Sequence, residues 1–377
     1  MKSMWWALVA LGGLVACDSG GGSDDVADGA VVDGGGAGGA GGAGGAGGAG
    51  GAGGAGGVGG AGGGGGGGEN VAGRLDRTID VDGVERTYIV YVPESAAGTT
   101  PVPVVFMFHG TSGDGDKFFN ISGWVQKADE EGFIAVFPSA LNHCFHEDEN
   151  RDGDFDDPGE QKVTTKWDSG RVGDDLPLCT DEEIAALPPA RRALADHPLA
   201  DDLGFVDAMI GALEADFAVD ASRIYASGFS NGGGFTSRLA AERSEVFAAL
   251  HASAGLLAVE TPPAPRAVPF ALSIGETDDR FVPPGQRIPL DESLADQPAF
   301  DNITTRYLAL LGLSPTYTFQ QVPVGPETVA QFEFTDGGGR FILSIIGGLG
   351  HQYPNGENHP LSIVNPLWTF FSAYQLP

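Results

Sequence analysis

A serine lies in a pentapeptide whose spacing suits nucleophilic catalysis. Ser230 is the centre of G-F-S-N-G at residues 228–232, between a short apolar run and a run with helical spacing. A serine on so sharp a strand-to-helix turn takes strained backbone angles, and glycine suits positions 228 and 232 because strand and helix nearly touch there. The sequence therefore predicts an exposed Ser230 hydroxyl that acts as a nucleophile.

A serine hydroxyl needs a general base, and that base needs a carboxylate to hold it in the right tautomer. The turn resembles the nucleophile elbow of the α/β-hydrolases, and this resemblance implies the chain order nucleophile, acid, histidine. Among the late histidines, His351 follows a predicted strand in a glycine-rich loop that could carry the imidazole over Ser230. His351 is the predicted base, and His359 is the weaker candidate.

The acid is expected just after the predicted strand at 269–274, where the chain reads G-E-T-D-D-R-F-V-P. A carboxylate beyond the C-terminal end of a strand lies where such a sheet forms its active site. Three acids compete at this position. Asp279, three residues before Val282, is the expected partner of His351, Asp278 is the main alternative, and Glu276 could be a solvated loop charge.

A histidine-glycine turn follows the predicted central strand at 103–108. A turn at this place supplies one backbone amide to an oxyanion hole, and the residue after the nucleophile supplies the other. The predicted donors are the amides of Thr111 and Asn231. His109 is expected to stabilise the loop rather than to act as a base.

Strands and helices alternate along the part of the chain that must position these residues. A hairpin is expected at 78–92, and the best amphipathic helix at 201–217. The alternation predicts an α/β fold: a mostly parallel sheet with helices on both faces, extended at one edge by the hairpin. Residues 141–198 lack this alternation of strands and helices and are expected to form a long insertion near the active site.

The amino-terminal residues have the pattern of an export signal. A lysine precedes a short apolar stretch that ends in L-V-A-C at Cys17, which resembles the bacterial lipobox. Residues 1–17 are therefore predicted to be a lipoprotein signal peptide with lipidation at Cys17; a plain secretory signal is the alternative. The Gly/Ala-rich residues 18–73 are expected to be a disordered tether, and residues 74–377 the folded domain. The predicted protein is exported and lipid-anchored to the cell envelope or cell surface.

The charge and the cysteine content limit the expected classes of binding partner and the expected state of the thiols. A net charge of −31 argues against nucleic acid, and the lipid is the only expected contact with a membrane. Beyond Cys17 the chain has Cys144 and Cys179, which are expected to form a disulfide in an oxidising compartment. Two separately buried thiols are the alternative.

An acidic stretch in the insertion has the spacing of a calcium-binding loop. Oxygen ligands stand at alternate positions around Gly153, namely Asp148, Asn150, Asp152, Asp154 and Asp156. Such carboxylates can wrap a hard cation, although the usual twelfth ligand is absent and a solvated acidic loop is the alternative. A bound calcium ion would order the insertion; no cofactor is expected for catalysis.

The motifs together resemble the exported esterases of the polyhydroxybutyrate depolymerase and feruloyl esterase type, a carbohydrate-esterase branch of the α/β-hydrolases. They are Y-I-V-Y-V-P at 88–93, F-H-G at 108–110, D-L-G-F-V at 202–206, G-F-S-N-G-G at 228–233, D-R-F-V-P at 279–283 and G-H-Q-Y-P at 350–354. The resemblance implies an α/β-hydrolase fold and a serine esterase acting on feruloyl or acetyl esters of polysaccharide, or on a hydroxyalkanoate polyester. Two departures beside the acyl pocket, Q-Y-P after His351 and G-E-T before the acid, weaken the inference about the substrate.

Two other functions fit the same motifs. Serine triad chemistry is shared with peptidases, so an exported serine peptidase is one alternative. The other is a surface binding module that has kept the fold and lost turnover.

Overall fold

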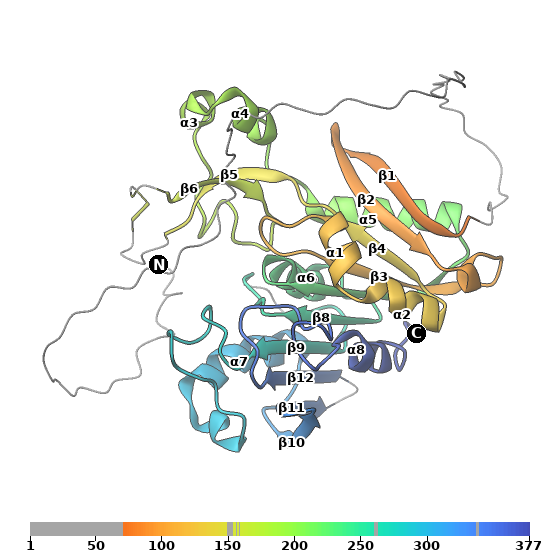
Figure 1. Cartoon of the computed structure of the whole chain (residues 1–377), viewed down its shortest axis with the longest axis vertical. Helices are drawn as coiled ribbons and strands as arrows, with labels where there is room; N and C mark the ends of the chain where they lie inside the picture. Colours follow the sequence, from red (N-terminus) through yellow and green to blue (C-terminus); the bar gives the residue numbers. More distant parts are fainter. Residues whose placement is uncertain (1–70, 149–153, 156, 158, 260–262, 337–338) are drawn as a thin grey trace, which may run out of the picture. The chain divides into compact units, whose positions relative to one another are not determined.

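The structure, a computed structural model, describes residues 71–148, 154–155, 157, 159–259, 263–336 and 339–377. Their main feature is a ten-stranded sheet in the order β1-β2-β4-β3-β7-β8-β9-β12-β11-β10 (Figure 1). Together with the helices on its two faces, this sheet forms an α/β-hydrolase fold, as the sequence predicts. Within these residues, no helix has the length and apolar character needed to cross a membrane.

Six neighbouring strands in the middle of the sheet run parallel. In sheet order they are β4 (Ile134–Pro138), β3 (Val102–Phe108), β7 (Val219–Phe229), β8 (Ala249–Ser253), β9 (Phe270–Gly275) and β12 (Gly339–Ile346). Every residue of β3 is buried, because helices cover both faces of the sheet. This explains why the sequence of β3 is a continuous apolar run rather than an alternating one.

Antiparallel strands extend both edges. The predicted hairpin is β1 (Gly73–Val81) and β2 (Val84–Val92), which pairs with β4. A second hairpin, β10 (Tyr317–Val324) and β11 (Glu327–Asp336), pairs with β12 and was not expected from the sequence. Its outer strand contains Pro323 and has several exposed side chains, both features that an edge strand tolerates and that weaken a strand pattern.

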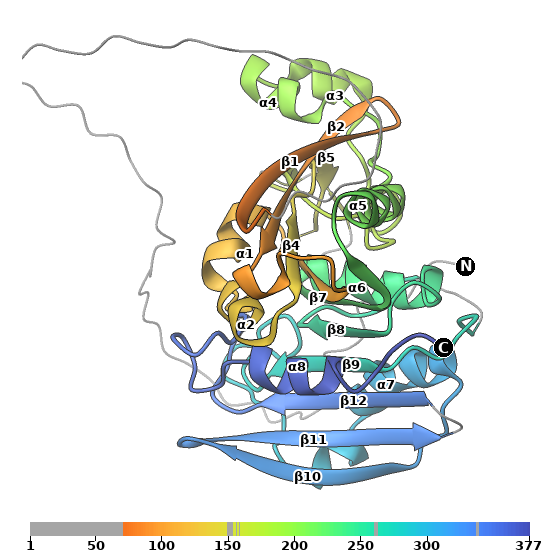
Figure 2. The ribbon, with the colours of Figure 1, turned by 90° about the vertical axis from the view of Figure 1, so that its right-hand side faces the viewer.

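The helices divide between the two faces of the sheet, as Figure 2 shows. One face carries α1 (Gly115–Ile121), α2 (Trp124–Glu131) and α8 (Val364–Phe371), and the other carries α5 (Asp202–Asp216), α6 (Asn231–Glu242) and α7 (Pro298–Leu311). Two hydrophobic cores result, and alternate residues of β3 belong to each: Phe106 to the α5–α7 side and Met107 to the α1–α2 side. Short 3-10 helices occupy Glu94–Ala96 and Glu292–Asp296.

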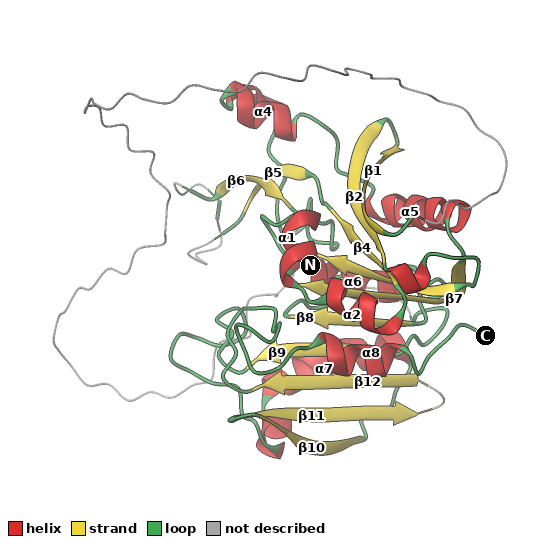
Figure 3. Cartoon of the chain, turned by 45° about the vertical axis from the view of Figure 1, so that its right-hand side comes forward, coloured by secondary structure: helices red, strands yellow, loops and turns green. Residues whose placement is uncertain are grey.

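The insertion has secondary structure that its sequence did not reveal. It contains a separate two-stranded sheet of β5 (Asn142–His146) and β6 (Gln161–Thr165) (Figure 3). The helices α3 (Asp181–Ala186) and α4 (Pro189–Ala195) follow (Figure 1). Cys144 and Cys179 form a disulfide with a Cα–Cα distance of 5.3 Å, which confirms the predicted pairing. The disulfide therefore joins β5 to the segment that leads into α3.

Removal of this disulfide is expected to loosen the insertion. The bond joins positions 35 residues apart. Closing a loop of that size lowers the conformational entropy of the unfolded chain, which raises its free energy by roughly 3–4 kcal/mol. In a Cys144→Ala/Cys179→Ala protein, the amides of β5 and β6 should exchange with solvent deuterium faster, and the midpoint of denaturant unfolding should fall. Unchanged exchange and midpoint would show that the bond contributes no stability.

Candidate active site

Ser230 lies at the junction of β7 and α6 with strained backbone angles. Its φ is 53° and its ψ is −119°, a combination that side-chain-bearing residues rarely adopt. A Cβ placed on Gly228 would lie 2.1 Å from the Gly232 carbonyl oxygen, and one on Gly232 would lie 2.4 Å from that of His109. The predicted need for small residues on both sides of the nucleophile is confirmed.

The structure brings Ser230, His351 and an aspartate together. The Nε2 atom of His351 lies 2.9 Å from Ser230 Oγ, and its Nδ1 atom lies 2.9 and 3.0 Å from the two carboxylate oxygens of Asp278. Asp278 is fully buried, and the His351 ring lies 5.1 Å from the ring of Phe229. A carboxylate that accepts from Nδ1–H leaves Nε2 free to accept a proton from serine.

The prediction that Asp279 is the acid is wrong. Its side chain is 65% exposed and lies 3.8 Å from the guanidinium of Arg280. After β9 the chain turns tightly: the Asp278 amide donates to Gly275 O, and the Asp278 carboxylate accepts from the Arg280 amide at 3.0 Å. This turn directs Asp278 toward His351 and leaves Asp279 in solvent, a choice that sequence spacing does not specify.

Glu276, regarded as a solvated charge from its sequence context, is buried and holds the histidine loop. Its carboxylate accepts from the Gly348 amide at 2.8 Å and from Arg287 Nη1 at 2.9 Å. The next residue, Thr277, donates to Leu349 O through both its amide and its hydroxyl. The acid loop and the histidine loop therefore hold each other, which sets the position of His351. No signal in the sequence pointed to this role.

The predicted oxyanion donors border the nucleophile. Thr111 follows β3, and Asn231 is the first residue of α6. A Cβ on Gly110 would lie 3.2 Å from Ser230 Cβ, so the loop after β3 lies against the serine. Among the residues that the structure describes, the amides of Thr111 and Asn231 donate to no protein acceptor. Both N–H groups are thus available to a ligand.

His109 is structural, as expected. It is fully buried, its Nε2 accepts from the Ala140 amide at 3.0 Å, and its Nδ1–H donates to Gly110 O at 2.7 Å. Burial lowers the pKa of His109 to about 4, so the ring is neutral near pH 7. His359 is also buried; it bonds Gly347 O and the Leu361 amide and so supports the loop before His351.

Three buried histidines predict that the protein loses stability in mild acid. Burial lowers the pKa of His109 and His143 to about 4 and that of His251 to about 3. The unfolded chain binds protons on these rings near pH 6.5, whereas the folded chain binds them only at about pH 4 for His109 and His143 and at about pH 3 for His251. The free energy of unfolding therefore falls as the pH drops from about 6.5 to 4. For one histidine the loss is on the order of 3 kcal/mol, at about 1.4 kcal/mol per pKa unit.

Urea unfolding at several pH values between 7 and 4 measures this effect. The ring nitrogens of His251 bond the Ser227 and Ser273 hydroxyls, so a His251→Gln protein keeps polar groups there and removes one titrating site. Its free energy of unfolding should depend less steeply on pH than that of the wild type. Equal slopes for the two proteins would show that His251 makes no contribution.

The predicted calcium ligands Asn150, Asp152 and Asp156 lie outside the described residues, so the calcium site stays a prediction. Among the described residues, one group of three metal-capable side chains gathers in the insertion: His146, Cys179 and Glu183. The Cys179 sulfur belongs to the disulfide and is not a thiolate ligand, and His146 Nε2 is 3.1 Å from the Glu183 carboxylate. The contact between His146 and Glu183 therefore joins β5 to α3 without a metal ion.

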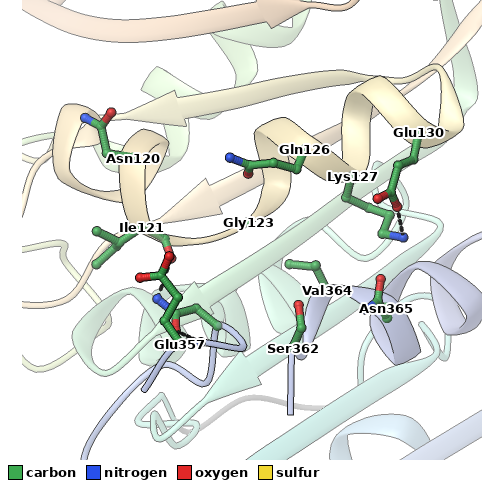
Figure 4. Close-up of a pocket in the computed structure, with 11 residues that line it drawn as sticks. Asn120, Ile121, Gly123, Gln126, Lys127, Glu130, Glu357, Ser362, Val364 and Asn365 are labelled. Atoms are coloured by element: carbon green, nitrogen blue, oxygen red, sulfur yellow. Dashed lines mark hydrogen bonds and ion pairs between the residues drawn. The ribbon is translucent and has the colours of Figure 1, made fainter. Parts of the chain in front are cut away.

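The structure also has a surface cavity of about 300 Å³ (Figure 4). Groups of α1, α2 and the segment around the start of α8 line it, among them Asn120, Gln126, Glu357 and Asn365. None of Ser230, Asp278 and His351 is part of its lining. The candidate active site is therefore identified by its chemical groups and not by this cavity.

Comparison with known proteins gives only distant likenesses. No family model matches the sequence, and no curated protein matches it. Among solved structures, the chain is similar to an acetyl xylan esterase from Aspergillus awamori, at 15% identity over 79% of this chain and 98% of that one, with a TM-score of 0.49. It is also similar to an S-formylglutathione hydrolase from Agrobacterium tumefaciens (15% identity, 81% and 95% coverage, TM-score 0.46) and to a ferulic acid esterase (14%, 80% and 97%, 0.44). At these levels the comparisons assign neither a family nor a substrate.

Proposed function

We propose that this protein is a serine hydrolase of carboxylic esters that works through an acyl-enzyme. The observation that carries the proposal is the line of hydrogen-bond distances from Ser230 Oγ through the His351 ring to Asp278, all between 2.9 and 3.0 Å. The strained turn at Ser230 and the amides of Thr111 and Asn231, which donate to no acceptor among the described residues, add the remaining parts of this chemistry.

The reaction proceeds in two halves. In the first, His351 Nε2 takes the Ser230 proton as Oγ attacks the ester carbonyl, while Asp278 stabilises the imidazolium that forms. The oxyanion receives hydrogen bonds from the amides of Thr111 and Asn231. His351 then gives the proton to the departing alkoxide, and the acyl group stays on Ser230. In the second half, His351 activates water, which releases the carboxylic acid and restores the serine.

The proposal is tested with a fluorophosphonate probe and with nitrophenyl acetate. The expected result is covalent labelling that forms at Ser230, together with ester hydrolysis that the label abolishes. Failure of the purified protein to react with the probe and with the ester would support a binding module instead. Faster turnover of matched amides than of esters would support a peptidase.

The finer substrate rests on the sequence motifs alone. Feruloyl and acetyl esters of polysaccharide, and hydroxybutyrate oligomers, are the proposed substrates, and a panel of these three esters under one set of conditions separates them by kcat/KM. The enzyme is proposed to be exported and lipid-anchored through Cys17, which lies outside the described residues.

A further inference from the structure

The Asn231 side chain is joined to the insertion at two points. Its Oδ1 accepts from the Trp167 amide at 2.6 Å, and its Nδ2 donates to Trp167 O at 3.0 Å. An amide bonded to both main-chain polar groups of one residue has a fixed orientation. Asn231 directly follows Ser230, so this contact holds the residue whose backbone N–H is one of the two proposed oxyanion donors.

The loop that carries the other donor is joined to the same segment at three points. Thr165 O accepts from the Ser112 amide at 3.1 Å, and the Thr165 hydroxyl donates to Gly113 O at 2.7 Å. The Trp167 indole N–H donates to His109 O at 2.9 Å. These contacts lie on both sides of Thr111. Because Ser112 has a φ of 61°, which non-glycine residues rarely adopt, the loop depends on its surroundings to keep this shape.

The segment that makes these contacts, around Trp167, is itself held firmly by its neighbours. Trp167 is fully buried, and its ring stacks on Phe235 of α6 at 5.3 Å and meets Phe108 of β3 edge-on at 5.2 Å. The next residue, Asp168, donates its amide to Asp202 at 2.7 Å and pairs with Arg238 at 2.8 Å. The segment is therefore a rigid connection between β3 and α6 and not a mobile border of the site.

We infer that residues 165–167, the bridging segment, set the spacing and orientation of the Thr111 and Asn231 amides during the reaction. Thr165 and Trp167 are positioning residues, because they act through the loop at 109–113 and through Asn231. The inference rests on the proposed function. It gives the insertion a part in the reaction itself, beyond shaping the entrance.

The expected effect is on kcat and not on KM. Loss of one oxyanion donor lowers kcat by about 10²–10³, and a displacement of about 1 Å lowers it by up to about 10². Removing one contact of the bridging segment leaves both donors present but less firmly placed. We therefore expect Thr165→Val and Trp167→Phe each to lower kcat by roughly ten- to fiftyfold, with little change in KM for nitrophenyl acetate.

Two control proteins match the Thr165 substitution. Thr165→Ser keeps the hydroxyl and should retain a kcat close to that of the wild type. Thr304→Val removes a buried hydroxyl that donates to Phe300 O within α7, far along the chain from the site, and should leave kcat unchanged. Melting temperatures of all variants show whether any loss reflects unfolding.

The decisive measurement is the affinity for a trifluoromethyl ketone, which forms a tetrahedral adduct with the serine and places an oxyanion in the hole. If the bridging segment positions the amides, the inhibition constant should rise by the same factor by which kcat/KM falls across the variants. A merely structural role would lower the melting temperature without this correlation.

The experiments distinguish a failure of this inference from a failure of the proposed function. Wild-type kcat and ketone affinity in both Thr165→Val and Trp167→Phe would overturn this inference and leave the esterase proposal intact. A wild-type protein that neither hydrolyses esters nor reacts with the fluorophosphonate probe would overturn the proposed function, and with it this inference.

Discussion

The Ser230→Ala protein is expected to lose ester turnover by about a millionfold while remaining folded. The hydroxyl is the only group within hydrogen-bond reach of His351 Nε2 among the described residues, so no other side chain there can take over the attack. Alanine keeps the Cβ and demands no new space at the crowded turn between β7 and α6. The remaining rate should be that of water attack assisted by the two amides and by substrate binding.

Initial rates with nitrophenyl acetate and labelling by the fluorophosphonate probe measure this loss. Ser372→Ala, at an exposed serine just after α8, is the matched control and should behave as the wild type in both assays. Comparable melting temperatures for the two variants would exclude unfolding. Ester turnover by Ser230→Ala within tenfold of the wild type would remove Ser230 from the mechanism.

The second large predicted effect distinguishes the roles of the adjacent residues Asp278 and Asp279. Asp278→Asn is expected to lower kcat by about 10⁴. An asparagine can present its NH₂ group to His351 Nδ1, which favours the tautomer with the proton on Nε2, and such a ring cannot accept the proton of Ser230. Asp279→Asn should change kcat by less than about twofold, because an exposed charge beside an exposed arginine contributes little.

The pair is informative because both substitutions remove one negative charge from the same turn. A general electrostatic effect would lower the two rates similarly, whereas the hydrogen bond to His351 exists only for Asp278. A larger loss of kcat in Asp279→Asn than in Asp278→Asn would contradict the assignment made from the structure.

Much of the fold follows from local patterns. The buried run that became β3 and the alternating runs that became β1 and β2 are properties of consecutive residues, so their strand character could be predicted. The outer hairpin of β10 and β11 was missed because an edge strand is stabilised by one neighbour and tolerates polar residues and proline.

The identity of the catalytic acid could not be predicted from the sequence. Asp278 and Asp279 are adjacent, identical in type and at the same end of β9, so no feature of composition or spacing separates them. The difference arises from main-chain hydrogen bonds of the turn, which direct one side chain inward and the next outward. The same holds for Glu276, whose carboxylate bonds Gly348 of the histidine loop, 72 residues later in the sequence.

What the sequence by itself determined is the nucleophile, its base and their order on a parallel sheet. Ser230 is marked by glycines that a sharp turn requires, and His351 by its place after the last parallel strand, and both requirements act between near neighbours. Only the tertiary structure decided which carboxylate completes the catalytic triad. It also decided that the insertion forms hydrogen bonds with both segments that carry the proposed oxyanion donors. Those outcomes depend on hydrogen bonds between segments far apart in the chain, whose geometry exists only once the sheet has brought them together.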